Sequence, residues 1–133
     1  MRIIDVAAGL VFRQGKVLIT RRKADEHLGG LWEFPGGKRD LDESFPDCLR
    51  RELREELGIE VEVKELLESL VHHYPEQSVR LEFYRCLLLK NEPQPLGCQA
   101  LAWAAPEELA HYSFPEADRR LLAKLCQAPG LWL

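Results

Sequence analysis

Three glutamates crowd one short stretch of the chain, at positions where their like charges must repel. Glu52, Glu55 and Glu56 stand three and four residues apart in a run with helical character. Residues at these spacings share one side of a helix, so the three carboxylates would face the same volume. Mg²⁺ and Mn²⁺ prefer oxygen ligands of this kind, and a cation would relieve the repulsion. The triplet alone also fits a solvent-exposed helix face laced with salt bridges, which is the usual structure of glutamate- and arginine-rich helices.

The residues around the triplet favour the metal site. Residues 34–38 read Phe-Pro-Gly-Gly-Lys and are expected to form a loop, and Glu43 follows them just before the helix. Arg51 precedes Glu55 by four residues, so its guanidinium can orient that carboxylate. A glycine loop placed above a carboxylate face predicts a divalent-metal centre.

The helix that must hold these glutamates is predicted over residues 44–57. Ser44 and Asp47 resemble a capping box, and Pro46 is tolerated in the first turn, where its missing N–H is harmless. Gly58 is expected to end the helix. An apolar stripe at every fourth position would turn one side of it to the core: Leu49, Leu53 and Leu57.

The other segments predict a sheet and a second helix. Strands are expected over residues 3–12, 16–22, 61–71, 80–89 and 100–104, with a short apolar stretch at 31–35 and a loop at 36–42. A second amphipathic helix is expected over residues 114–125. This order indicates one domain of the α+β or α/β class, a mixed central sheet with a helix on each face.

Composition limits the possible partners. The chain has 133 residues and a net charge of −4, which argues against general binding of nucleic-acid polymers or anionic membranes, because such proteins usually carry a basic face. A small anionic ligand remains possible because local charge decides that question. The four cysteines form no CxxC pair, which favours a reducing cytoplasmic location.

The glutamate stretch also resembles a known family. Residues 37–59 match the Nudix box, G-x5-E-x7-R-E-U-x-E-E-x-G-U, at every defined position: Gly37, Glu43, Arg51, Glu52, Leu53, Glu55, Glu56, Gly58 and Ile59. The stretches "LITRRKADEHLGGLWEFPGGK" and "FPEADRRLLAKL" are similar to the MutT branch of that family. The resemblance covers about residues 3–125 and implies the Nudix fold, a mixed sheet sandwiched between helices, over residues 1–133.

The resemblance implies an activity and a cofactor. MutT-like proteins hydrolyse nucleoside triphosphates to monophosphate and pyrophosphate with Mg²⁺, for which Mn²⁺ can substitute. Their substrates include damaged or non-canonical nucleotides such as 8-oxo-dGTP, so the implied role is sanitation of the nucleotide pool in DNA repair. A nucleotide is then the expected partner, with neither a nucleic-acid polymer nor a membrane, and the protein is expected to be a monomer or weak homodimer.

The resemblance also assigns roles residue by residue. The implied metal ligands are the backbone carbonyl of Gly36 and the carboxylates of Glu52, Glu55 and Glu56. Glu43 and Arg51 are implied to hold the loop on the helix. The implied phosphate contacts are Arg22 and Lys38, and the implied borders of the base pocket are Phe34 and Leu81 or Phe83. Asp118 stands where MutT relatives read the edge of the base.

One position departs from the pattern. MutT-like sequences often carry a further glutamate six residues before a tryptophan, and counting back from Trp103 this chain has Gly97. That glutamate is a supplementary metal ligand or a candidate general base in relatives. The general base therefore stays open here, with Glu55 or Glu56 as the first hypothesis.

Alternatives to the damaged-nucleotide hypothesis remain. The substrate could be CTP or a 5-substituted dCTP, ADP-ribose or a dinucleoside polyphosphate. An ionised Asp118 only accepts hydrogen bonds, which suits an exocyclic amine, whereas relatives that prefer oxidised guanine have an asparagine there. A non-catalytic nucleotide-sensing Nudix domain is a third possibility, and the intact glutamate set argues against it.

Overall fold

The chain folds around its first strand, β1 (Ile3–Arg13), in the computed structural model, which describes residues 3–132. β1 pairs in parallel with β6 (Ser78–Lys90), and antiparallel with β4 (Gly36–Lys38) and β2 (Lys16–Arg21). Its side chains are buried on both faces of the sheet, as a central strand requires. One parallel pair among antiparallel ones makes the sheet mixed, as the sequence predicts.

The remaining strands extend the sheet on both sides of this centre. β5 (Glu60–His73) pairs antiparallel with β6, while β2 also pairs with β3 (Trp32–Glu33) and β7 (Ala100–Ala104). The strand order is β3-β2-β1-β6-β5. The predicted strands are confirmed to within a few residues. Residues 36–38, expected in a loop, form a short strand because their backbone pairs with β1.

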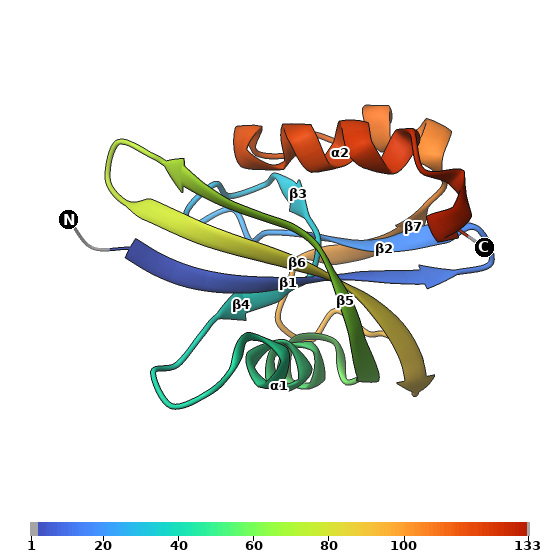
Figure 1. The fold of residues 1–133 in the computed structure, drawn as a ribbon, viewed down its shortest axis with the longest axis horizontal. Coiled ribbons are helices and arrows are strands. Elements are labelled where there is room, and N and C mark those ends of the chain that lie inside the picture. The colour runs from blue at the N-terminus through green and yellow to red at the C-terminus, as the bar shows by residue number, and fades with distance from the viewer. Residues whose placement is uncertain (1–2, 133) are drawn as a thin grey trace.

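Helices α1 (Phe45–Leu57) and α2 (Arg119–Cys126) cover opposite faces of the sheet (Figure 1). The predicted fold class is confirmed, but the second helix begins later than residue 114. Pro115 disfavours helical geometry for Phe114, and its own ψ of 154° is extended. The chain then makes a 3₁₀ turn, η2 (Glu116–Asp118), before α2 begins. Two further 3₁₀ turns are η1 (Pro106–His111) and η3 (Pro129–Trp132).

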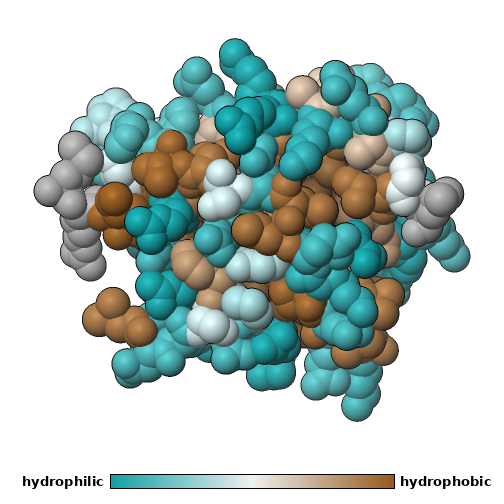
Figure 2. Space-filling view, in the orientation of Figure 1, coloured by the Kyte–Doolittle hydropathy of each residue, from teal (hydrophilic) through white to brown (hydrophobic). Residues whose placement is uncertain are grey.

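The surface of the molecule is mixed in polarity. Figure 2 shows hydrophilic side chains interrupted by apolar groups on the face seen in Figure 1. No helix within residues 3–132 is long and apolar enough to cross a membrane.

Helix α1 is fixed at both ends and along its inner side. The Ser44 hydroxyl accepts a hydrogen bond of 3.1 Å from the Asp47 N–H, and Gly58 ends the helix at a φ of 69°. A left-handed φ favours glycine, so the sequence signal at this end is confirmed. The inner side carries the predicted leucines and one cysteine, all buried: Cys48, Leu49, Leu53 and Leu57.

Because α1 is held by this apolar side, shortening one of its leucines should weaken the whole fold. Leu53→Ala should lower the free energy of unfolding by about 2–5 kcal/mol, through lost burial and the cavity left behind. Urea denaturation would measure it. Leu41→Ala is the matched control, since Leu41 is 93% exposed and should change stability by less than about 0.5 kcal/mol. Equal effects of the two variants would contradict this packing.

Candidate active site

The backbone of β4 lies between β1 and the glutamate face of α1. A Cβ atom on Gly36 would stand 1.9 Å from the carbonyl oxygen of Ala7, and one on Gly37 would stand 2.2 Å from the carboxyl group of Glu52. The contact with the Ala7 backbone requires glycine at position 36, whereas a side chain at position 37 would displace the Glu52 carboxylate. The close approach places the Gly36–Gly37 backbone and the Glu52 carboxylate side by side.

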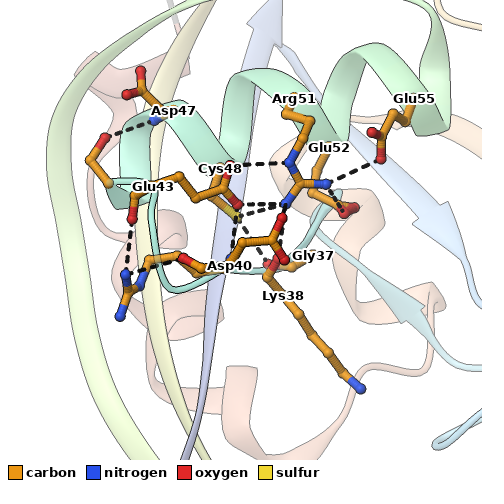
Figure 3. A network of polar contacts seen from close by, with 11 residues as sticks. Gly37, Lys38, Asp40, Glu43, Asp47, Cys48, Arg51, Glu52 and Glu55 are labelled. Carbon is orange, nitrogen blue, oxygen red and sulfur yellow. Dashed lines mark hydrogen bonds and ion pairs between the residues drawn. The ribbon is translucent and has the colours of Figure 1, made fainter.

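Arg51 ties the loop after β4 to α1 (Figure 3). Its Nη2 and Nε donate to the two carboxylate oxygens of Glu43, at 2.6 and 3.1 Å, and Nη2 also donates to the carbonyl of Lys38 at 3.1 Å. These bonds, with one from the Asp40 backbone, hold the pKa of Glu43 down at about 2. The pair therefore lies where the sequence expects residues that hold the loop on the helix.

The same guanidinium also offsets part of the repulsion between the glutamates. Its Nη1 donates to Glu52 at 3.1 Å and to Glu55 at 3.2 Å. The Glu52 side chain is 14% exposed, whereas the Glu55 side chain is 59% exposed and lies at the rim. Arg51 thus draws two of the three carboxylates towards itself.

Glu56 is placed differently, inside the site and over the loop before β7. Burial, followed by the charges of Glu52 and other acids, raises its pKa to about 7. Its backbone carbonyl accepts hydrogen bonds from the N–H groups of Leu96 and Gly97, both at 3.0 Å. A Cβ on Gly97 would come within 2.7 Å of the Glu56 carboxylate. The departure from the family pattern at this position therefore leaves room for Glu56.

A cavity of about 640 Å³ opens beside these carboxylates. Its polar part is lined by Gly36, Gly37, Lys38, Glu52 and Glu56, among others. Apolar side chains, including Ala8, Phe34, Val79, Leu81 and Phe83, line it as well, together with Asp118. The Phe34 ring meets those of Phe83 and Phe114 at centroid distances of 6.2 and 5.3 Å. All predicted pocket residues except Glu55, Glu43 and Arg51 thus line one cavity.

Asp118 is buried in the wall of this cavity. It is 5% exposed, and burial followed by the charge of Glu33 raises its pKa to about 7. Although it occupies the residue before α2, its side chain makes no capping hydrogen bond to that helix. The carboxyl group is therefore available to a ligand rather than used as a helix cap.

Arg22 is already engaged by its neighbours. Its Nε donates to the carbonyl of His27 at 2.7 Å, Nη1 donates to Glu33 at 2.9 Å, and Nη2 lies 3.9 Å from Glu26. Its contact with a phosphate stays a prediction. Lys38 is exposed, and Figure 3 places its side chain pointing away from the Arg51 network.

The sequence analysis missed two features of the cavity. Glu33 lines it, and the only sequence signal was one acid within the apolar stretch Leu31–Pro35. His27 and Glu76 also line it, with Nδ1 of the histidine 3.0 Å from a carboxylate oxygen of the glutamate. They are far apart in the sequence, so no local pattern joins them.

The donor chemistry of the polar part fits a divalent cation. Within residues 3–132 no three His, Cys, Asp or Glu side chains converge as a ready-made metal cage. Arg51 explains this, because it holds Glu52 and Glu55. Burial and the neighbouring carboxylates raise the pKa of Glu56, and a hard cation would stabilise its ionised form. The residues that would hold it are Gly36, through its carbonyl, Glu52, Glu56 and, from the rim, Glu55.

Known proteins share the sequence and the fold. The chain matches the NUDIX domain family over residues 7–124. It is 40% identical over 122 residues to the CTP pyrophosphohydrolase of Escherichia coli K12, covering 92% of this chain and 90% of that protein. It is 32% identical over 126 residues to the 8-oxo-dGTP diphosphatase of the same organism, covering 94% and 98%. The crystal structure of a MutT NUDIX hydrolase from Burkholderia pseudomallei has a TM-score of 0.85 at 27% identity, covering 94% of this chain and 99% of that one.

The burial of Asp118 should make stability depend on pH. Its pKa rises from 3.8 in water to about 7 in the fold, so the unfolded chain loses this proton first and stability falls as pH rises from about 4 to 7. Asp118→Asn removes this loss, so it should stabilise the ligand-free protein little at pH 4 and by up to roughly 4 kcal/mol at pH 8.

Urea denaturation of both proteins across this range would measure the difference. Asp42→Asn is the control, because Asp42 is exposed and its carboxylate stays in water in both states. A constant difference between wild type and Asp118→Asn at all pH values would contradict the burial of a carboxyl group that ionises near neutrality.

Proposed function

The chain belongs to the Nudix family and is a hydrolase of phosphorus-containing acid anhydrides, and we propose that it cuts nucleoside triphosphates to monophosphate and pyrophosphate. The proposed substrates are damaged or non-canonical nucleotides such as 8-oxo-dGTP. One observation carries this proposal. A single cavity is lined by carboxylates suited to a cation, by the aromatic rings of Phe34 and Phe83, and by the buried Asp118, whose side chain caps no helix. That arrangement suits a molecule with phosphates at one end and a base at the other.

Members of the family use divalent cations, and Mg²⁺, with Mn²⁺ as a substitute, is the ion we propose. When bound it would neutralise phosphate charge and lower the pKa of a bound water. Glu52 and Glu56, with the carbonyl of Gly36, would hold it at the inner end of the site. A triphosphate carries about four negative charges, so carboxylates alone would repel it strongly.

Glu56 is the residue best placed to take a proton from the attacking water. Its side chain lies in the cavity against Gly97, whereas Glu55 lies at the rim in contact with Arg51. Lys38 lines the polar part of the cavity and can donate to phosphate oxygens as charge develops on the leaving pyrophosphate. Arg22 would also donate to phosphate oxygens, through the N–H groups that its contacts within the protein leave free.

A second candidate substrate is CTP or a 5-substituted dCTP. Asp118 favours it, because an ionised carboxylate accepts from an exocyclic amine such as cytosine N4. The 40% identity to the Escherichia coli CTP pyrophosphohydrolase supports the same choice. A protonated Asp118, which its burial favours, can instead donate and accept as an amide does, and that form suits oxidised guanine.

The remaining possibilities have less support. ADP-ribose and dinucleoside polyphosphates have the same anhydride chemistry, but no feature of the cavity selects them. A non-catalytic nucleotide sensor would not need the complete set of Glu52, Glu55 and Glu56. We propose that residues 1–133 act as one Nudix domain, a monomer or weak homodimer in the cytoplasm, on free nucleotides rather than on nucleic-acid polymers or membranes.

The metal assignment and the reaction are tested together. Pyrophosphate release should occur with canonical, oxidised or methylated nucleoside triphosphates and stop in EDTA. Glu52→Gln and Glu56→Gln should each lower turnover by about 100-fold or more, since metal ions supply several kcal/mol of transition-state stabilisation. Glu62→Gln, an exposed change on β5, is the control. Full activity in EDTA, or near-normal turnover in both cavity variants, would refute the proposal.

Base selection is tested at Asp118. Asp118→Asn should shift the ratio of kcat/KM values towards 8-oxo-dGTP and away from cytosine nucleotides, because an amide donates as well as accepts. Asp118→Ala should cost about 1–3 kcal/mol in kcat/KM for the best substrate, by leaving a buried partner unpaired. Steady-state kinetics over the nucleotide panel would measure both. An unchanged ranking in Asp118→Ala would mean that the base lies elsewhere.

A further inference from the structure

The segment from Trp32 to Gly36 links two parts of the protein that border the cavity. At its start, the Trp32 N–H donates to the carbonyl of Ser113 at 2.8 Å, next to the stretch that leads to Asp118. At its end, Gly36 pairs with Ala8 of β1 and lies beside Glu52 through its neighbour Gly37. Glu33 lies within this segment and lines the cavity. Along the chain it therefore stands between the anchor near Asp118 and the residues proposed to hold the cation.

The Glu33 carboxylate is held in place on one side only. Oε1 accepts a hydrogen bond of 2.9 Å from Nη1 of Arg22. Arg22 is itself fixed by its bond to the carbonyl of His27. Within residues 3–132, Oε2 accepts no hydrogen bond. Glu33 lines the cavity and its side chain is 29% exposed, so the oxygen without a protein partner is available to a ligand.

Burial is the main cause of the raised pKa values of Glu56 and Asp118, and the charge of Glu33 is a further cause of both. A phosphate is a poor partner for this oxygen, because two anions repel. A hydroxyl group is a good partner, since an O–H bond to a carboxylate is charge-assisted.

The sugar of a nucleotide always lies between its base and its phosphates. We propose that Oε2 of Glu33 accepts a hydrogen bond from a hydroxyl group of the bound sugar, which makes Glu33 a specificity-determining residue. This inference rests on the proposed nucleotide substrate. Arg22 is then a positioning residue, whose guanidinium fixes the orientation of the Glu33 carboxylate. The enzyme would discriminate nucleotides by their sugars as well as by their bases.

Substrates that lose their hydroxyls one at a time test this inference. CTP, dCTP and ddCTP, and the matching guanine series, differ only in the 2′ and 3′ hydroxyls. Removing the hydroxyl group that donates to Glu33 should lower kcat/KM by about 10- to 100-fold in the wild type, the usual range for a hydrogen bond to a charged group. The step from CTP to dCTP reports the 2′ hydroxyl, and the step from dCTP to ddCTP reports the 3′ hydroxyl.

In the variant Glu33→Ala, the ratio of kcat/KM with that hydroxyl to kcat/KM without it should fall close to one, for cytosine and guanine nucleotides alike. Glu76→Gln is the matched control, since Glu76 also lines the cavity but pairs with His27, and it should keep the wild-type ratio. Thermal unfolding would verify that each variant folds. Should Glu33→Ala not fold, Glu33→Gln and calorimetric binding of CMP, dCMP and ddCMP to the wild type would give the same comparison.

Several outcomes would overturn the inference while leaving the proposed function intact. One is hydrolysis of all three cytosine nucleotides by the wild type at equal kcat/KM. Another is an unchanged ratio in Glu33→Ala. A third is an equal loss on every sugar together with weaker Mn²⁺ binding in a calorimetric titration, which would make Glu33 a metal ligand. If no nucleoside triphosphate is hydrolysed, the proposed function fails and this inference fails with it.

Discussion

The close contact between the backbone of β4 and its two neighbours is the constraint on which the site depends. Gly36 lies against β1 with no room for a side chain, and Gly37 lies against Glu52, whose carboxylate a side chain there would displace. Arg51 then fixes the loop that follows through its two bonds to Glu43. The glycines bring a carbonyl and a carboxylate together, and the arginine keeps them there.

Some carboxylates of this site are paired with an arginine and others are not. Arg51 contacts Glu43, Glu52 and Glu55, while burial raises the pKa values of Glu56 and Asp118 in the cavity. Such groups make the ligand-free protein less stable than an apolar pocket would. A bound cation and a polar base would stabilise these carboxyl groups. The ligand-free protein is thus less stable at these positions, and ligand binding is correspondingly more favourable.

The sequence predicted those parts of the site that depend on local spacing. The helix over α1, its capping at Ser44 and Gly58, and the shared side of its glutamates all follow from helical periodicity. The later start of α2 did not follow, because Pro115 competes with an amphipathic pattern. The place of Glu33 in the cavity wall could not be predicted either, since it depends on which segments the sheet brings together. Tertiary contacts between distant segments leave no local pattern in a single sequence.

The parallel pairing of β1 with β6 has a consequence for how the protein is made. Ile3 is the register partner of Ser78, so more than half of the chain must leave the ribosome before the first strand gains this neighbour. Until then the apolar residues of β1 are covered only in part, by β2, the short β4 and helix α1, which all precede β6 in the chain. Long-range pairing of this kind slows folding and leaves nascent chains open to aggregation. During synthesis β1 therefore waits longest for the strand that pairs with most of its length.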